Sequence, residues 1–232
     1  MTSRRDELAA NLERLEKRLT TACAAAGRSR DEITLIAVTK TFPADDIRHL
    51  VELGVTNIGE NRDQEARAKA EALSELAVTW HFVGQLQSNK CRSIAQYADV
   101  VHAVDRDRVV SALSNGAHEA QRRVDVLIQV SLDEDPARGG AAPATARDLA
   151  VEIAAAPNLR LRGVMAVAPL GGDASTAFAE LARVAFDVRS VHPEATVISA
   201  GMSGDLEAAI QAGATHVRIG TALLGVRSPP VR

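Results

Sequence analysis

The stretch "TLIAVTKTFPADDI", residues 34–47, contains the strand, the turn and the helix start on which the fold prediction depends. Leu35 to Thr39 form an apolar run rich in β-branched residues, which predicts a buried strand. The run stops on Lys40, and a helical pattern begins at Ala44. A lysine directly after a buried strand needs an explanation, because an ammonium group is costly to bury without a partner.

The same order of strand and helix continues along the chain. Similar runs predict eight strands, at 33–39, 55–58, 78–83, 100–104, 124–130, 159–167, 196–199 and 216–219. Helical patterns lie at 5–26, 44–53, 61–76, 106–120, 143–156, 174–191 and 205–212. This alternation indicates a parallel sheet covered by helices, and eight repeats predict a closed (β/α)8 TIM-type barrel. An open doubly wound sheet is less favoured, because no GxGxxG follows the first strand.

Length and composition predict one domain and exclude several classes of function. The chain has 232 residues, 46% of them hydrophobic, and we expect an N-terminal helix at 1–27 and a barrel at 33–225. A net charge of −3 and 3% aromatic residues argue against binding to nucleic acid or anionic lipid. No apolar segment approaches the ~20 residues of a membrane span, and a charged N-terminus predicts a cytoplasmic protein. Cys23 and Cys91 are predicted to be free thiols, and no metal site is expected.

Lysine is rare in this chain, with four lysines among 27 basic residues. Arginine supplies charge elsewhere, but only an amine can lose a proton and attack a carbonyl group. Lys17 and Lys69 fit ordinary helical faces. Lys90, several residues beyond the third strand, is the rival of Lys40 but is expected at an exposed helix start, with a secondary contact as the alternative.

Two other strand ends are suited to bind an anion. "GMSGDLEAAI" places Ser203 and glycines before a helix, and "RIGTALLG" adds Gly220 and Thr221 after the last strand. Each motif alone fits a plain helix start, but the loops after strands seven and eight are the usual phosphate site of this barrel. A phosphate site and a reactive amine on Lys40 together suggest a phosphorylated aldehyde such as pyridoxal 5′-phosphate (PLP). Arg218 is expected inside the barrel, against the pyridine nitrogen; an ion pair, for example with Glu60, is the alternative.

The motifs "LIAVTK", "GEN", "WHFVGQLQSNK", "LRGVMAV" and "GMSGDLEAAIQAGATHVRIGTALLG" resemble those of the pyridoxal phosphate homeostasis proteins, single-domain relatives of the alanine racemase barrel. The resemblance covers about Ile33 to Gly225. It implies PLP held as a Schiff base on Lys40, with phosphate contacts from Ser203, Gly220 and Thr221. It also implies that Arg218 lies near the pyridine nitrogen and that Asn61, in "GEN", lies close to the cofactor.

Two segments depart from the family pattern. The loop at 133–146 reads Arg138-Gly139 where the family often has a lysine before glycine, so a contact that needs a neutral amine there is in doubt. Strand six ends "MAVAPLGG", where many members have a more polar or proline-rich ending, and Met165 is given no role.

We expect a PLP-binding protein that buffers or delivers the cofactor, with PLP-dependent apoenzymes as the partners and a monomer as the assembly. A slow racemase or related enzyme is the alternative, and a cofactor-free barrel is the third hypothesis. Racemisation needs a base on each face of the cofactor. The racemases take the second base, a tyrosine, from an extra β-domain that we do not expect here, and Tyr97 is predicted to be a packing residue. His81 and His102 are expected to form hydrogen bonds inside the barrel.

Overall fold

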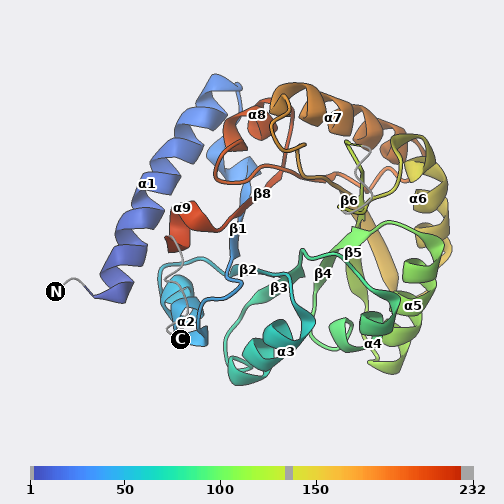
Figure 1. Cartoon of the computed structure of the whole chain (residues 1–232), viewed down its shortest axis with the longest axis horizontal. Coiled ribbons are helices and arrows are strands. Elements are labelled where there is room, and N and C mark those ends of the chain that lie inside the picture. Colours follow the sequence, from blue (N-terminus) through green and yellow to red (C-terminus); the bar gives the residue numbers. More distant parts are fainter. Residues whose placement is uncertain (1–2, 134–137, 226–232) are drawn as a thin grey trace.

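The computed structural model describes residues 3–133 and 138–225, so residues 134–137 of the loop predicted at 133–146 lie outside it. Its strands form one closed parallel barrel, in which each strand pairs with the next and β8 pairs with β1 (Figure 1). The predicted TIM-type barrel is therefore confirmed. The strands are β1 (Thr34–Val38), β2 (Asn57–Glu60), β3 (Thr79–Phe82), β4 (Val100–Val104), β5 (Val124–Gln129), β6 (Leu159–Met165), β7 (Val197–Ser199) and β8 (His216–Ile219).

Helices surround this barrel and differ in detail from the predicted ranges. They are α1 (Arg4–Ala25), α2 (Ala44–Glu52), α3 (Asp63–Ala72), α4 (Cys91–Ile94), α5 (Asp107–Glu119), α6 (Ala146–Ala155), α7 (Ala174–Val191), α8 (Leu206–Gln211) and α9 (Thr221–Leu224), with 3-10 turns at Arg30–Glu32, Ser88–Lys90 and Pro143–Thr145. α3 begins two residues later than predicted because Arg62 is still extended, with φ −128° and ψ 120°. α9 was given no helical range, since four residues are too few to show a helical period, but it begins at Thr221, where a plain helix start was the alternative interpretation of that motif.

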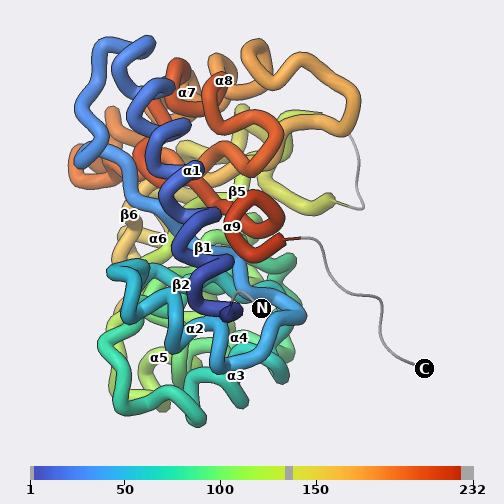
Figure 2. The backbone as a smooth tube through the Cα atoms, turned by 90° about the vertical axis from the view of Figure 1, so that its left-hand side faces the viewer, coloured from blue at the N-terminus to red at the C-terminus, as the bar shows by residue number. Residues whose placement is uncertain are grey.

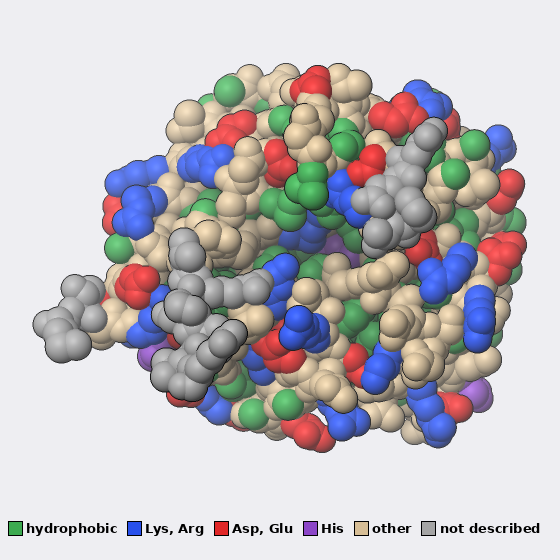
Figure 3. All heavy atoms as spheres, in the orientation of Figure 1, with side chains coloured by type: hydrophobic (Ala, Val, Ile, Leu, Met, Phe, Trp, Pro, Cys, Tyr) green, Lys and Arg blue, Asp and Glu red, His purple; other side chains and the backbone are tan. Residues whose placement is uncertain are grey.

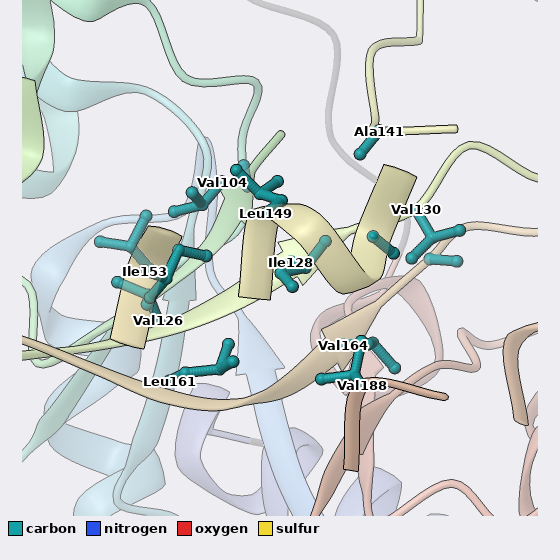
Figure 4. Packing of buried hydrophobic residues seen from close by; sticks show 14 of the residues in the cluster. Val104, Val126, Ile128, Val130, Ala141, Leu149, Ile153, Leu161, Val164 and Val188 are labelled. Carbon is teal, nitrogen blue, oxygen red and sulfur yellow. The ribbon is translucent and has the colours of Figure 1, made fainter. Parts of the chain in front are cut away.

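Alternate residues of each strand face the helices and form the main core. In β1, Leu35 and Ala37 belong to the cluster between barrel and helices, whereas Ile36 and Val38 alternate with them and face the barrel interior. Figure 4 shows the same arrangement on the other side, where Val126 and Ile128 of β5 meet Ile153 of α6. Each fully buried aliphatic side chain contributes about 1.5–3 kcal/mol.

The N-terminal helix α1 packs along the outside of the barrel, against α8, α9 and α2 (Figure 2). A capping box formed by Ser3 and Asp6 starts it, and Leu8, Leu15 and Leu19 are buried on one face. The helix therefore lies next to the loops that follow β7 and β8.

Candidate functional site

Lys40 lies in a tight turn at the end of β1, half-buried at the carboxyl end of the barrel. The backbone N–H of Phe42 donates to the carbonyl oxygen of Thr39 at 3.0 Å and closes the turn around Lys40 and Thr41. Thr41 has a φ of 68°, a left-handed conformation that β-branched residues rarely adopt. The Thr39 hydroxyl donates to Glu60 Oε1, which also accepts from Lys69 of α3, so the Thr39 side chain faces that helix.

Asn61 follows β2, next to the Lys40 turn. The backbone N–H of Thr39 donates to the carbonyl oxygen of Gly59 at 3.0 Å, which joins the ends of β1 and β2. The Asn61 Oδ1 atom is buried and has no hydrogen-bond partner among the described residues. The backbone of Gly84 packs against that of Asn61, so closely that a Cβ atom added to Gly84 would lie 2.2 Å from the Asn61 carbonyl oxygen. The Asn61 side-chain oxygen is therefore free to accept a hydrogen bond, and the close contact with Gly84 fixes the Asn61 backbone.

The loops after β7 and β8 meet, as the sequence predicts. Ser203 Oγ accepts a hydrogen bond from the backbone N–H of Ala222 at 3.2 Å. Gly220 precedes α9 and approaches β1, since a Cβ on it would lie 3.5 Å from the Val38 carbonyl oxygen. Thr221 begins α9 and is exposed. The two predicted phosphate motifs and the Lys40 turn thus occupy neighbouring strand ends.

Arg18 of α1 binds the loop after β7 and the first turn of α8, a contact that the sequence did not predict. Its Nη1 donates to the carbonyl oxygen of Ser203 at 2.7 Å, and its Nη2 donates to Glu207 Oε2 at 2.6 Å. A charged residue on a helix that precedes the barrel gives no sequence signal for a contact almost 200 residues away.

Arg218 lies in β8 with only 5% of its surface exposed. Nη1 donates to the carbonyl oxygen and the hydroxyl of Ser199, at 2.8 and 2.7 Å, and Nη2 donates to the Ala166 carbonyl oxygen at 2.8 Å. Burial lowers its pKa to about 10. The alternative ion pair with Glu60 is wrong, because Glu60 hydrogen-bonds to other residues through Oε1 and its Oε2 has no described partner.

A chain of buried hydrogen bonds extends from Ser199 across the barrel interior. His102 Nδ1 lies 3.1 Å from Ser199 Oγ, His102 Nε2 lies 3.0 Å from His81 Nδ1, and His81 Nε2 lies 2.9 Å from Asn57 Oδ1. Because Asn57 Oδ1 only accepts, one direction satisfies every link: Ser199 donates to His102, His102 to His81, and His81 to Asn57. The Ser199 oxygen then accepts from Arg218. The predicted histidine hydrogen bonds are confirmed, but their connection to Arg218 was missed.

Burial keeps these histidines neutral. It lowers the pKa of His81 to about 3 and the pKa of His102 well below its ordinary value. It also lowers the pKa of His216, in β8, to about 4, with Arg162 and Arg218 adding repulsion. Figure 3 shows His and Lys or Arg side chains inside a hollow at the centre of the molecule.

These shifts predict that stability falls as the pH falls below about 6.5. An unfolded histidine binds its proton near pH 6.5, and His216 in the fold does so only near pH 4. Between these values the unfolded chain binds more protons, which lowers the free energy of unfolding by about 1.4 kcal/mol per pH unit for each such histidine. Urea unfolding of His216→Gln should show a shallower decline with pH, whereas exposed His118→Gln should keep the wild-type slope. An unchanged slope in His216→Gln would contradict the burial argument.

Lys90 and Tyr97 have the surroundings that the sequence predicts. Lys90 ends a 3-10 turn, its side chain is 41% exposed, and its Nζ lies 3.9 Å from Asp63 Oδ2. It lines a cavity of about 320 Å³ together with Asn61, so it lies near the site but in contact with water. Tyr97 packs against the two clusters of buried residues between barrel and helices, the one with Leu35 and the one with Val126, and burial raises the pKa of its phenol.

The Arg138 side chain contacts the backbone of the loop that follows the next strand, β6. Its Nη2 donates to the Ala168 carbonyl oxygen at 2.8 Å, and its Nη1 pairs with Asp133 at 2.5 Å. Gln129 Nε2 donates to the Arg138 carbonyl oxygen at 3.0 Å. A permanently charged guanidinium therefore bridges the loops after β5 and β6 here. Met165, which was given no role, is a buried residue at the end of β6.

Within residues 3–133 and 138–225, no cluster of three or more His, Cys, Asp or Glu side chains is arranged to hold a metal ion. Among the helices of those ranges, none combines the length and the apolar character needed to cross a membrane.

Comparisons with known proteins agree on one family. The family model described as "Alanine racemase, N-terminal domain" matches residues 5–228. The chain is 40% identical to the pyridoxal phosphate homeostasis protein of Escherichia coli over 96% of this chain and 97% of that one. It is also 40% identical to the protein of the same name from Mycobacterium bovis, over 97% and 94%. The structure of PipY from Synechococcus elongatus with PLP bound is 35% identical, with a TM-score of 0.79 over 89% of this chain and 100% of that one.

Proposed function

The chain belongs to the pyridoxal phosphate homeostasis proteins within the alanine racemase N-terminal domain family, and on that premise we propose that it binds PLP. Lys40 holds the cofactor as a Schiff base, and the protein buffers or delivers PLP for other enzymes. The observation that supports this best is the position of the Lys40 turn, which lies between Asn61 on one side and the meeting loops of Ser203 and Gly220 on the other.

The residues around Lys40 fit PLP. The buried Asn61 Oδ1 has no described partner and can accept a hydrogen bond from the hydroxyl group on the cofactor ring. Ser203 and the backbone at Gly220 and Thr221 lie where two loops converge, as a phosphate requires. A PLP aldehyde supplies a carbon that an uncharged amine attacks, with loss of water. The protein supplies the amine on Lys40.

Arg218 favours holding the cofactor over transforming amino acids with it. Three of its five N–H donors are used by Ser199 and Ala166, which leaves two for a ligand. A guanidinium can only donate, so against the pyridine nitrogen it keeps that atom unprotonated and the ring a weaker electron sink. Since Ser199 is itself held by the chain through His102, Arg218 has a fixed orientation.

A PLP titration tests the proposal. We expect one PLP bound per chain, with a visible absorbance band that saturates. Ser203→Ala should weaken binding by roughly 3- to 10-fold, because it removes one hydroxyl from the phosphate loop. Ser190→Ala is the matched control, since that exposed hydroxyl donates to the Asp187 carbonyl oxygen of its own helix, α7. Absence of saturable binding would overturn the proposed function, and an unchanged affinity in Ser203→Ala would overturn the phosphate position.

A further inference from the structure

Lys69 of α3 is a buried ammonium with three partners, whereas the sequence suggested only a lysine on an ordinary helical face. It is 7% exposed. Its Nζ donates to Glu60 Oε1 at 2.6 Å, to Glu65 Oε1 at 2.7 Å and to the Thr39 carbonyl oxygen at 2.9 Å. Glu60 Oε1 also accepts from the Thr39 hydroxyl at 2.6 Å. All of these contacts lie between the barrel and α3, behind the end of β1.

The same network holds both neighbours of Lys40. Thr39 is bound through its carbonyl oxygen and its hydroxyl. Thr41 is bound through its backbone N–H, which donates to Glu65 Oε1 at 2.5 Å. The φ of 68° at Thr41 is unfavourable for a β-branched residue and persists only where surrounding contacts hold it. One ammonium thus supports the carboxylate that binds Thr41 and directly binds Thr39.

A buried ion pair gives little evidence of a stabilising role. The free energy needed to remove two charges from water is about as large as the free energy of their attraction, and proteins with well-packed apolar replacements are often equally stable. Here the Glu60 Oε2 atom has no described partner, and burial raises the pKa of Glu60 despite the contacts with Lys69 and Thr39. The network is therefore better explained by the geometry that it imposes on the turn.

We propose that Lys69, acting through Glu60 and Glu65, is a positioning residue that holds the strained turn so that the Lys40 amine faces the barrel interior. This inference rests on the proposed function, because it assigns the network a part in covalent PLP binding at Lys40. Lys69 itself lies on α3 and contacts the turn from outside the barrel, so it does not touch the cofactor.

The test uses the double variant Glu60→Gln/Lys69→Met, which removes the ion pair without leaving a buried carboxylate unpaired. We expect hydrogen–deuterium exchange of the amides at Thr41 and Phe42 to accelerate at least about tenfold, because the turn opens more often. With PLP at one equivalent, we expect the fraction of Lys40 trapped by borohydride to fall about tenfold. The matched control is Glu13→Gln/Lys17→Met, the same two replacements in an exposed pair on α1, and it should change neither measurement.

Adding Thr41→Gly separates positioning from packing. Glycine adopts a positive φ without a steric cost, so it should make the network dispensable. We expect the triple variant to recover Lys40 trapping to within about threefold of wild type. Equal exchange and trapping in wild type and double variant would overturn the proposal, and so would a loss of trapping that Thr41→Gly does not restore. If wild-type Lys40 traps no PLP, the proposed function fails, while the exchange measurement still decides whether the network holds the turn.

Discussion

The Lys40→Ala protein is expected to lose the absorbance band of the lysine Schiff base completely and to release the cofactor during gel filtration. Alanine has no amine to condense with the aldehyde, and the phosphate loop at Ser203 alone can hold PLP only reversibly. Spectra recorded before and after gel filtration measure both effects. We expect the variant to fold like the wild type, because Lys40 is only half-buried and its side chain has no hydrogen bond among the described residues.

Lys90→Ala is the control for that result. Lys90 lines one cavity with Asn61, and among the described residues its Nζ makes only a long contact of 3.9 Å with Asp63 Oδ2. It should keep the wild-type spectrum. A band that survives in Lys40→Ala and disappears in Lys90→Ala would mean that the wrong lysine has been assigned.

Gly163→Ala is expected to have the largest effect on stability. Gly163 lies in β6 with φ 153°, and a Cβ there would lie 1.8 Å from the carbonyl oxygen of Val197 in β7. Two paired strand backbones cannot separate without breaking the closed barrel, so we expect a loss of at least about 3 kcal/mol in the free energy of unfolding. Urea unfolding followed by circular dichroism measures it.

Gly213→Ala distinguishes the cost of backbone strain at a positive φ from the cost of a steric clash between strands. Gly213 also has a positive φ, of 96°, but a Cβ on it would meet no atom within 4 Å. It should cost only the backbone strain, about 1–2 kcal/mol. If both variants lost the same stability, the close approach of β6 and β7 would not be the cause.

The barrel could be predicted from sequence because its signal is local and repeated. Each strand is a short apolar run, and a closed barrel needs only the count and the strict alternation with helices. Lys40 could be located for the same reason, since it ends the first run. The ends of these runs were less accurate: strand six was predicted to Val167 but ends at Met165, because apolar loop residues continue the pattern.

The support behind the site could not be predicted, because it depends on contacts between distant segments. Lys69 looked like an ordinary helical lysine, and only the fold places it beside Glu60 and Thr39. The hydrogen bond between His102 and Ser199 joins β4 to β7 across the barrel. Arg18 reaches Ser203 from the first helix. None of these pairs has a spacing that a strand or helix period would show.

The most direct test of PLP attachment at Lys40 is to identify the residue that carries the cofactor after borohydride reduction. Wild-type protein with one equivalent of PLP is reduced, digested and mapped by mass spectrometry, so that all four lysines are compared in one sample. We expect a phosphopyridoxyl group on Lys40. Unmodified Lys40, with the group on another lysine or on none, would contradict the central claim.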